Sequence, residues 1–451
     1  MLSPDLIRKY NQPVPRYTSY PTVPYWENNL DPSNWEHLVK KAFNLTGKKN
    51  GLTLYIHLPF CESLCTYCGC TKRITKNHNV EVPYLEAVLR EWSHYLKLFG
   101  ESPKIAGIHL GGGTPTFFSS QNLSLLISEI LSSAEVLPDA EFSFEGHPNN
   151  TTFDHLDQLA RLGFDRVSYG IQDFDPRVQK AIHRIQPFEK VKEATDNARK
   201  LGYSSINFDL IYGLPHQTLN SLAATFDRVA QLRPERIAFY SYAHLPAAFP
   251  AQRGFEPHLP KDQEKRALYE SGKEMLIQMG YEEVGMDHFA LADDPLCAAK
   301  RKGNLHRNFM GYTTSPSEML IGLGASSISD IGLAFAQNEK NIESYLKLTH
   351  EFNLPIVRGH VQTETDRTVR KLIMELICRE KVEIPDLILD ELLPENLQNL
   401  VLLEEDGLIT KTGSVLTVTA EGKALVRNIC SQFDLRMNAS RAQKAFFSNS
   451  I

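Results

Sequence analysis

Short apolar runs alternate with stretches of helical periodicity along the first half of the chain. The apolar runs have the length and composition of buried strands, and they lie at residues 52–58, 105–111, 140–146, 165–171, 204–213 and 235–243. Between them, stretches such as 82–99 and 219–232 place their apolar residues on one helical face. This alternation predicts an α/β fold whose parallel strands are joined by right-handed crossovers. Both an open sheet and a barrel fit the pattern.

Polar residues or glycines stand at the C-terminal end of nearly every predicted strand. They are His57, the glycines at 111–113, Glu145, Gln172, Asp209 and His244. The carboxyl ends of parallel strands meet at one edge of the sheet, and this edge carries the active site in barrels and in open sheets alike. The pattern therefore locates a functional site without deciding between the two architectures.

The pattern changes near residue 365, where helices are followed by a hairpin. Residues 368–380 and 385–407 have helical periodicity, 407–422 reads as a hairpin, and 422–433 reads as a further helix. This order predicts a smaller, mostly helical domain that resembles a winged helix. Such modules often bind DNA, but the stretch 380–406 is strongly acidic, which disfavours contact with phosphates. We expect a structural cap and no nucleic-acid partner.

Length and charge narrow the class of protein. The 451 residues suggest one large domain and one smaller domain, since single cores stop growing near ~250–300 residues. A net charge of −6 predicts no general attraction to nucleic acid or anionic membranes. We find no run of ~18 apolar residues that would span a membrane, and the first residues lack the apolar core of a secretory signal. We therefore expect a cytoplasmic protein.

Four of the seven cysteines fall within ten residues, in the spacing C-x3-C-x2-C-x-C. They are Cys61, Cys65, Cys68 and Cys70, whereas Cys297, Cys378 and Cys430 are scattered singly. Structural zinc sites usually add a second, distant cysteine pair, and thioredoxin-like chemistry needs an isolated C-x2-C. An iron–sulfur cluster held by the first three thiolates fits best. Zinc, and Cys70 as a fourth ligand, remain as alternatives.

The cysteine spacing resembles that of the radical S-adenosylmethionine (SAM) enzymes. The motif follows a predicted strand, and the glycine stretch GGGTPT (111–116) comes about fifty residues later. In that family the open iron of a 4Fe–4S cluster binds the methionine part of SAM. An electron from the reduced cluster then cleaves SAM and produces a 5′-deoxyadenosyl radical. The cofactor supplies the radical chemistry, while the protein positions the reactants and excludes water.

Further stretches resemble one branch of this superfamily, the oxygen-independent coproporphyrinogen III oxidases. The resemblance covers nearly the whole chain, and RYTSYPT (16–22), NFDLIYGLPHQT (207–218) and RNICSQFD (427–434) are among the stretches that carry it. It implies a partial (β/α)6 barrel with a helical C-terminal domain. We accordingly divide the chain into an arm at 1–50 that closes over the active site, the barrel with its extension at 51–364, and a C-terminal domain at 365–451.

The resemblance also implies a reaction, in which two propionates of coproporphyrinogen III become vinyl groups and give protoporphyrinogen IX. Each round would use one SAM, with an electron donor such as a flavodoxin or ferredoxin system and an unknown terminal acceptor. We expect a monomer that holds two SAM molecules. Two alternatives stay open, a haem chaperone of the same superfamily and a radical SAM enzyme acting on another tetrapyrrole.

The resemblance assigns the cofactor residues one by one. Cys61, Cys65 and Cys68 would hold the cluster. Consecutive glycines let a cofactor approach the backbone, and an arginine suits bidentate pairing with a carboxylate, so Gly112 and Arg184 also fit on chemical grounds. The full set expected to contact SAM is Tyr55, Tyr67, Gly112, Gly113, Thr114, Glu145, Gln172, Arg184, Asp209, Ala243 and Ile328.

The remaining assignments concern the substrate, a tetra-acid that needs cations around its propionates. Arg16 is the expected partner, because arginine suits carboxylates best. Cys70 and His57 are expected to act in catalysis. Two residues depart from the family pattern: His147 stands where an acidic residue was expected, and Met310 stands where some relatives carry glutamine.

Overall fold

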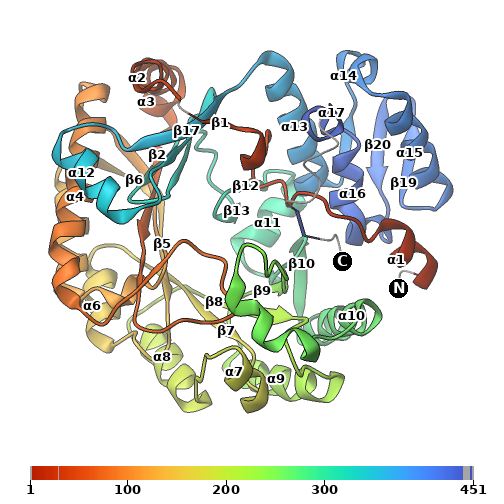
Figure 1. Ribbon diagram of the computed structural model, residues 1–451, viewed down its shortest axis with the longest axis horizontal. Coiled ribbons are helices and arrows are strands. Elements are labelled where there is room, and N and C mark those ends of the chain that lie inside the picture. The colour runs from red at the N-terminus through yellow and green to blue at the C-terminus, as the bar shows by residue number, and fades with distance from the viewer. Residues whose placement is uncertain (1–2, 29, 440–446, 449–451) are drawn as a thin grey trace.

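Six parallel strands form the centre of the computed structural model, which describes residues 3–28, 30–439 and 447–448 (Figure 1). They lie side by side in the order in which they occur along the chain. Their bounds are β2 (Leu52–Leu58), β5 (Lys104–Gly112), β6 (Glu135–Gly146), β7 (Arg166–Gln172), β8 (Ser205–Tyr212) and β9 (Arg236–Ser241). The predicted α/β class is confirmed, and β2 has exactly the expected bounds. This sequential order is compatible with a partial (β/α)6 barrel.

Helices in the crossovers cover the outer face of these strands, as Figure 1 shows for α4, α6, α8 and α9. The crossover helices are α4 (Glu81–Phe99), α5 (Ser120–Ser132), α6 (Phe153–Arg161), α7 (Pro176–Ala181), α8 (Phe188–Lys200) and α9 (Leu219–Leu232). Helix α9 begins after a capping box, in which the Thr218 and Ser221 side chains bond each other's backbone amides. Strand β2 is buried along almost its whole length, as expected for a parallel strand covered on both faces.

The sheet continues beyond the six strands at both ends, giving thirteen strands in all among the described residues. Beside β2 lie β14 (Leu320–Leu323), β15 (Ile328–Asp330), β16 (Ala334–Asn338), β17 (Ile356–Val361) and β1 (Glu27–Asn28). Beside β9 lie β11 (His288–Leu291) and β10 (Tyr281–Gly285). The connecting helices are α2 (Pro32–Ala42), α3 (Lys48–Asn50), α10 (Asp262–Gln278), α11 (Pro295–Lys302) and α12 (Ile342–His350). Apart from β14, which is parallel to β2, these added strands pair antiparallel.

The C-terminal part is helical with a small sheet. Its elements are α13 (Glu364–Arg379), β18 (Lys381–Glu383), α14 (Asp386–Glu391), α15 (Pro394–Glu405), β19 (Ile409–Thr412), β20 (Val415–Val418), α16 (Val426–Ser431) and α17 (Leu435–Ala439). The expected hairpin is β19–β20, and β18 extends it to three strands. The long helix expected over 385–407 is instead two helices, because Pro394 lacks the backbone N–H that would continue α14.

The N-terminal segment lies against the C-terminal part. Helix α1 (Pro4–Tyr10) and the following chain share an apolar core with it, to which Ile7, Tyr17 and Tyr20 contribute. The Tyr17 hydroxyl donates to Asp434 at 3.1 Å. Figure 1 shows α1 beside α15 and α16. In the part of the chain that the structure describes, no helix has the length and apolar character needed to cross a membrane.

Candidate active site

The clustered cysteines occupy a loop that follows β2. The short strands β3 (Phe60–Cys61) and β4 (Arg73–Ile74) pair and close the base of the loop. Within it, the Lys72 ammonium donates to the carbonyls of Cys68 at 3.0 Å and Cys70 at 3.3 Å. The Cys68 amide donates to the Cys65 carbonyl at 3.2 Å. These bonds hold the loop as a compact turn whose four cysteines line one cavity.

Two of the thiols receive hydrogen bonds from distant segments. The Thr114 hydroxyl donates to Cys61 Sγ at 3.3 Å, and the Arg184 guanidinium donates to Cys65 Sγ at 3.5 Å. The Thr114 hydrogen bond favours the thiolate of Cys61, the form that binds metal, and so opposes burial, which raises the pKa of that thiol. Cys61, Cys65 and Cys68 are half-buried, whereas Cys70 is exposed.

One cavity gathers most of the residues predicted to bind cofactors. It opens at the carboxyl ends of the central strands, beside the cysteine loop. The predicted residues that line it are Cys61, Cys65, Tyr67, Cys68, Cys70, Gly112, Gly113, Thr114, Glu145, Gln172, Arg184 and Asp209. The cavity is therefore built by segments from several of the central strands, and it brings the cysteine loop together with carboxylates and an arginine.

Glycine is required at positions 112 and 113, because other parts of the chain lie too close to leave room for a side chain. A Cβ at Gly113 would lie 2.7 Å from the carbonyl carbon of Pro59, so any larger residue would force the backbone apart. Gly112 has a φ of +114° and its Cβ would lie 2.7 Å from the His57 ring. The two glycines let the end of β5 lie directly against the start of the cysteine loop.

Arg184 and Gln172 meet above the end of β7. The Arg184 guanidinium donates twice to the Gly170 carbonyl, at 2.6 and 3.1 Å. Gln172 has a φ of +66°, and the strand pairing shifts register between Gly170 and Gln172. This bulge ends the regular pairing of β7 at the cavity, where a glutamine in a left-handed conformation marks a functional constraint.

Two carboxylates in the cavity have opposite pKa shifts. Burial, together with the negative charge of Glu145, raises the pKa of Asp209 to about 7. Burial acts in the same direction on Glu145, but its hydrogen bonds with His109 and the Gly112 amide outweigh it and hold the pKa of Glu145 below its ordinary value. Near neutral pH the cavity thus has one ionised carboxylate and one that exchanges a proton readily.

Five predicted residues do not line this cavity. His57 lies behind Gly112, only 6% exposed, with its two ring nitrogens 3.0 Å from the Tyr55 hydroxyl and the Thr71 carbonyl. Tyr55 therefore supports His57 from the interior of β2. This position suits a structural role for the histidine more than direct contact with a substrate.

Ala243, Ile328 and Arg16 are also at the periphery. The Ala243 carbonyl accepts a hydrogen bond from Gln252 at 3.4 Å. Ile328 packs against Gly322 of β14, the residue in register with Tyr55. Arg16 pairs with Asp287 at 3.3 Å, donates to the Ser241 carbonyl and lies over the ring of Tyr240, which itself lines the cavity.

Several residues that shape the site were assigned no role from the sequence. Gln252 is 1% exposed and joins the carbonyl of Tyr67, in the cysteine loop, to that of Ala243. It lies within the stretch 242–253, which resembles the family, but nothing in that stretch indicates its two partners. Lys72 and His109 lie near or within motifs, but the sequence did not indicate their partners. In the fold, Lys72 bonds two carbonyls of the cysteine loop, and His109 pairs with Glu145.

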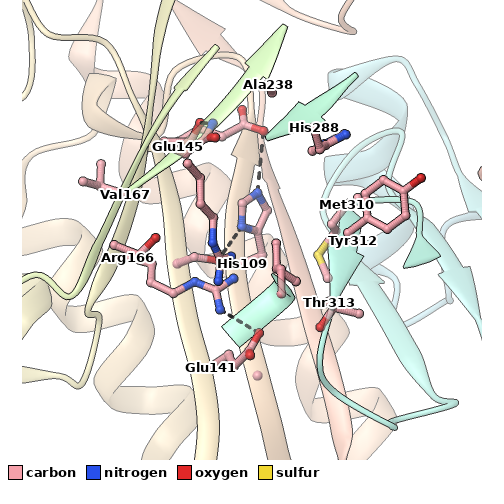
Figure 2. Close-up of a pocket in the computed structure, with 18 of the residues that line it drawn as sticks. His109, Glu141, Glu145, Arg166, Val167, Ala238, His288, Met310, Tyr312 and Thr313 are labelled. Atoms are coloured by element: carbon pink, nitrogen blue, oxygen red, sulfur yellow. Dashed lines mark hydrogen bonds and ion pairs between the residues drawn. The ribbon is translucent and has the colours of Figure 1, made fainter. Parts of the chain in front are cut away.

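A second cavity adjoins the first on the inner side of the sheet (Figure 2). The residues that line both cavities are Glu145, Ser168, Asp209 and Tyr240. Figure 2 shows Glu145 bonded to His109 at one end and Arg166 paired with Glu141 at the other.

Met310, which departs from the family pattern, lines this second cavity, whereas His147 lines the first. Burial and the charge of Arg184 lower the pKa of His147 to about 3, so this imidazole is neutral.

The cysteine loop fits a cluster better than a single metal ion. Among the described residues, no three His, Cys, Asp or Glu side chains converge as ligands of one ion. Cys61, Cys65 and Cys68 nonetheless line the same cavity, and two of the thiols receive polar hydrogen bonds. A 4Fe–4S cluster needs this arrangement, since each thiolate holds a different iron.

Comparison with known proteins decides between an iron–sulfur cluster and a zinc site in the cysteine loop. The model of the radical SAM superfamily matches residues 55–229. The oxygen-independent coproporphyrinogen III oxidase of Synechocystis sp. is 37% identical over 98% of this chain and 97% of its own, and that of Escherichia coli K12 is 39% identical over 97% and 96%. The chain belongs to this family. The solved structure of the Escherichia coli coproporphyrinogen III oxidase, described as a radical SAM enzyme, matches with a TM-score of 0.88 over 96% of this chain and 99% of its own.

Membership of the radical SAM coproporphyrinogen III oxidase family identifies the cofactors. The chain is a radical SAM oxidoreductase that uses a 4Fe–4S cluster and SAM, as predicted from the cysteine spacing. The zinc interpretation of the cysteine loop is thereby set aside. The predicted family and fold class are confirmed, whereas the role of each site residue remains a prediction.

Proposed function

We propose that this chain converts coproporphyrinogen III to protoporphyrinogen IX by oxygen-independent oxidative decarboxylation. The observation that carries the proposal is the single cavity in which three cysteines, two glycines, Arg184 and two carboxylates come together. Its support is the full-length similarity to oxidases of that name. At each of two propionates, the net change is loss of a β-hydrogen atom, CO2 and one electron, which leaves a vinyl group.

Cys61, Cys65 and Cys68 would hold the cluster, leaving one iron for SAM. When bound and reduced, the cluster supplies the electron that cleaves SAM to a 5′-deoxyadenosyl radical. The protein's own contribution is to stabilise the thiolates and to keep water out. Thr114 and Arg184 donate to two of the thiols, and Lys72 keeps the loop in the conformation that presents all three.

The rest of the cavity would hold SAM. Arg184 has a planar guanidinium that suits a carboxylate, and Gly113 allows the backbone to approach the methionine part. Asp209 and Gln172 are placed to bond ribose hydroxyls, since both line the cavity near Arg184. Two SAM molecules would be bound in all, one for each decarboxylation, and we assign Tyr55, Ala243 and Ile328 to their periphery.

The substrate would enter near Arg16, whose guanidinium lies over the ring of Tyr240 at the edge of the cavity. A propionate can replace Asp287 as the partner of Arg16, because the two pair across 3.3 Å and both are partly exposed. The arm at 1–50 would then close over the substrate. Cys70 is exposed and lines the cavity, and it would act on the substrate, whereas His57 would support the loop from behind.

The cellular setting follows from the chemistry. All seven cysteines are unpaired, which suits the reducing cytoplasm. We propose that the protein works there as a monomer, and that a flavodoxin or ferredoxin system reduces the cluster. The terminal electron acceptor would be a separate component.

The test is an anaerobic assay of the cluster-reconstituted protein with coproporphyrinogen III, SAM, a reductant and a cell extract that supplies the acceptor. Chromatography of the oxidised porphyrins should show protoporphyrin, a tricarboxylate intermediate and 5′-deoxyadenosine. Deoxyadenosine without a change in the porphyrin would mean that the substrate is another tetrapyrrole. An intact cluster that yields no deoxyadenosine, with stable haem binding, would instead indicate the chaperone.

A further inference from the structure

A third cavity, remote from the cysteine loop, lies between α13 and the amino-terminal end of the central strands. One wall is helix α13, and the others are β12 (His306–Asn308) and the segment 315–320. Its volume is about 520 Å³. We call it the α13 cleft. The reaction described above uses none of the residues that set its charge.

The cleft is cationic. Five Arg or Lys side chains line it, against three carboxylates: Arg307, Arg367, Arg370, Lys371 and Arg379 face Glu318, Asp330 and Glu375. Arg370 is paired with Asp330, and Arg379 with Glu375 at 3.8 Å. Within the described residues, Arg367 and Lys371 form no ion pair. They lie one helical turn apart on α13, so two uncompensated charges face the same cavity.

Unused hydrogen-bonding capacity also lines the cleft. Gln362 lines the cleft and is 5% exposed, yet neither its amide nitrogen nor its amide oxygen has a hydrogen-bond partner among the described residues. The Nε of Arg307 is also buried without a partner, although its Nη1 donates to the carbonyls of Arg16 and Tyr17. Buried polar groups normally find partners, so this lining has the character of a binding site.

The lining is also partly apolar, which restricts the kind of anion that fits. Leu305, Pro316, Leu320 and Met374 contribute to it. An inorganic ion or a small carboxylate would leave this surface uncovered. A molecule with an apolar body and carboxylates at its edge would cover the apolar lining and place its charges beside Arg367 and Lys371.

The cleft is separate from the active site. Among the described residues, none lines both the cleft and the cysteine cavity. Between them lies the second cavity of Figure 2, which shares Thr53, Asn308, Thr313 and Ser315 with the cleft. A ligand in the cleft would therefore leave the cluster and SAM site free.

We propose that the α13 cleft is a second binding site, for an amphipathic polycarboxylate that has an apolar ring system with acidic side chains. Coproporphyrinogen III and its product belong to this class, so the choice of ligand rests on the proposed function. Arg367 and Lys371 would receive the carboxylates, and the Gln362 amide would donate to one of them.

The test is a binding titration of the holoenzyme with coproporphyrin III, the stable oxidised form of the substrate, followed by quenching of its fluorescence. The wild type should bind two molecules per chain. The double variant Arg367→Gln, Lys371→Gln should lose one of them, with at least a tenfold weaker affinity at that site. A matched control, Lys40→Gln with Lys41→Gln on α2, removes two exposed charges elsewhere and should still bind two. A single wild-type site that the Arg367→Gln, Lys371→Gln variant retains, or equal losses in both double variants, would overturn the proposal.

Two further experiments test the role of Gln362 and the kind of anion that the cleft binds. Gln362→Leu keeps the volume but removes the amide, and it should weaken the second site without changing the melting temperature. If citrate competes for the cleft with an affinity equal to that of coproporphyrin, the site binds small anions and the amphipathic assignment is wrong. Turnover of coproporphyrinogen III by the same preparations tests the proposed function independently, because the double variant should retain full turnover at saturating substrate.

Discussion

The guanidinium of Arg184 lies 3.5 Å from the sulfur of Cys65, although 119 residues separate the two along the chain. The same side chain donates twice to the carbonyl of Gly170 at the end of β7. A single arginine thus connects the cysteine loop to the central sheet. Its position explains why a partly buried cation lies at the site, where negative thiolates and a ligand carboxylate would offset its charge.

Arg184→Lys should impair SAM cleavage while leaving the cluster in place. A lysine ammonium cannot donate to Gly170, Cys65 and a carboxylate in the planar geometry of the guanidinium. Loss of one charge-assisted hydrogen bond costs ~1.5–3 kcal/mol, so deoxyadenosine formation should fall by roughly 10- to 100-fold. Iron content per chain should be unchanged. Arg177→Lys, at a side chain that is 72% exposed, is the matched control. An unaltered rate for Arg184→Lys would contradict its assignment.

Serine in place of Cys61, Cys65 or Cys68 should abolish cluster assembly, because each thiolate holds a different iron. Cys70→Ser should still assemble the cluster, with its absorbance and full iron content, and should reduce porphyrin turnover. Cys297→Ser, which changes a buried cysteine outside the cavity, serves as the control. Should Cys70→Ser fail to bind iron, the cluster would have four cysteine ligands.

Gly113→Ala should weaken SAM binding by more than tenfold and lower stability. The new Cβ would lie 2.7 Å from the Pro59 carbonyl carbon, a backbone atom that cannot rotate away. Overpacking of this kind costs ~1–3 kcal/mol, and the shift would displace the loop that carries the thiols. Equilibrium dialysis of SAM and thermal unfolding measure the two effects. Gly254→Ala has open space around the new Cβ and should behave as wild type.

Arg16→Gln should raise the KM for coproporphyrinogen III by about tenfold, with little change in the kcat measured at saturation. The side chain would lose one charge-assisted bond to a propionate, and such bonds contribute ~1.5–3 kcal/mol. The comparison variant is Arg8→Gln, on the same arm but 67% exposed and paired only locally with Asp5. Equal KM values for the two variants would remove Arg16 from the substrate site.

The buried carboxyl group of Glu91 should make the stability of the fold depend on pH, independently of catalysis. It is 2% exposed, accepts from Asn338, Tyr345 and the Gly324 amide, and burial raises its pKa to about 7. Between pH 4.5 and 7 the folded protein keeps this proton while the unfolded chain loses it, so the free energy of unfolding falls as pH rises through that window. At ~1.4 kcal/mol per pKa unit, the contribution is about 3 kcal/mol.

Glu91→Gln should remove that part of the pH dependence. Denaturant unfolding of the wild type and the variant at pH 5, 6 and 7 measures it, and the variant should gain stability relative to the wild type as pH rises. Glu86→Gln, at an exposed position on the same helix α4, corrects for the loss of one charge. Parallel stability curves for the wild type and Glu91→Gln would show that Glu91 is ionised in the folded protein throughout this range.

Local patterns predicted the central sheet and the cluster motif. The apolar run at 52–58 is β2 residue for residue, and 219–232 is α9, because burial on both faces of a strand or on one face of a helix is recorded in neighbouring residues. The cysteine spacing and the glycines that follow are also local, so the family and its cofactors were predictable. The polar strand ends Glu145, Gln172 and Asp209 were expected at one edge of the sheet, and they line one cavity there.

The sequence by itself therefore determined the α/β class, the parallel strands and the chemistry of the cysteine loop. Only the tertiary structure decided which distant groups meet. It places His57 behind Gly112 rather than in the cavity, joins Tyr67 to Ala243 through Gln252, and brings Arg367 and Lys371 together with Gln362 at the α13 cleft. The physical reason is that periodicity reports the burial of a segment, whereas contacts between segments depend on how the sheet and the C-terminal domain pack.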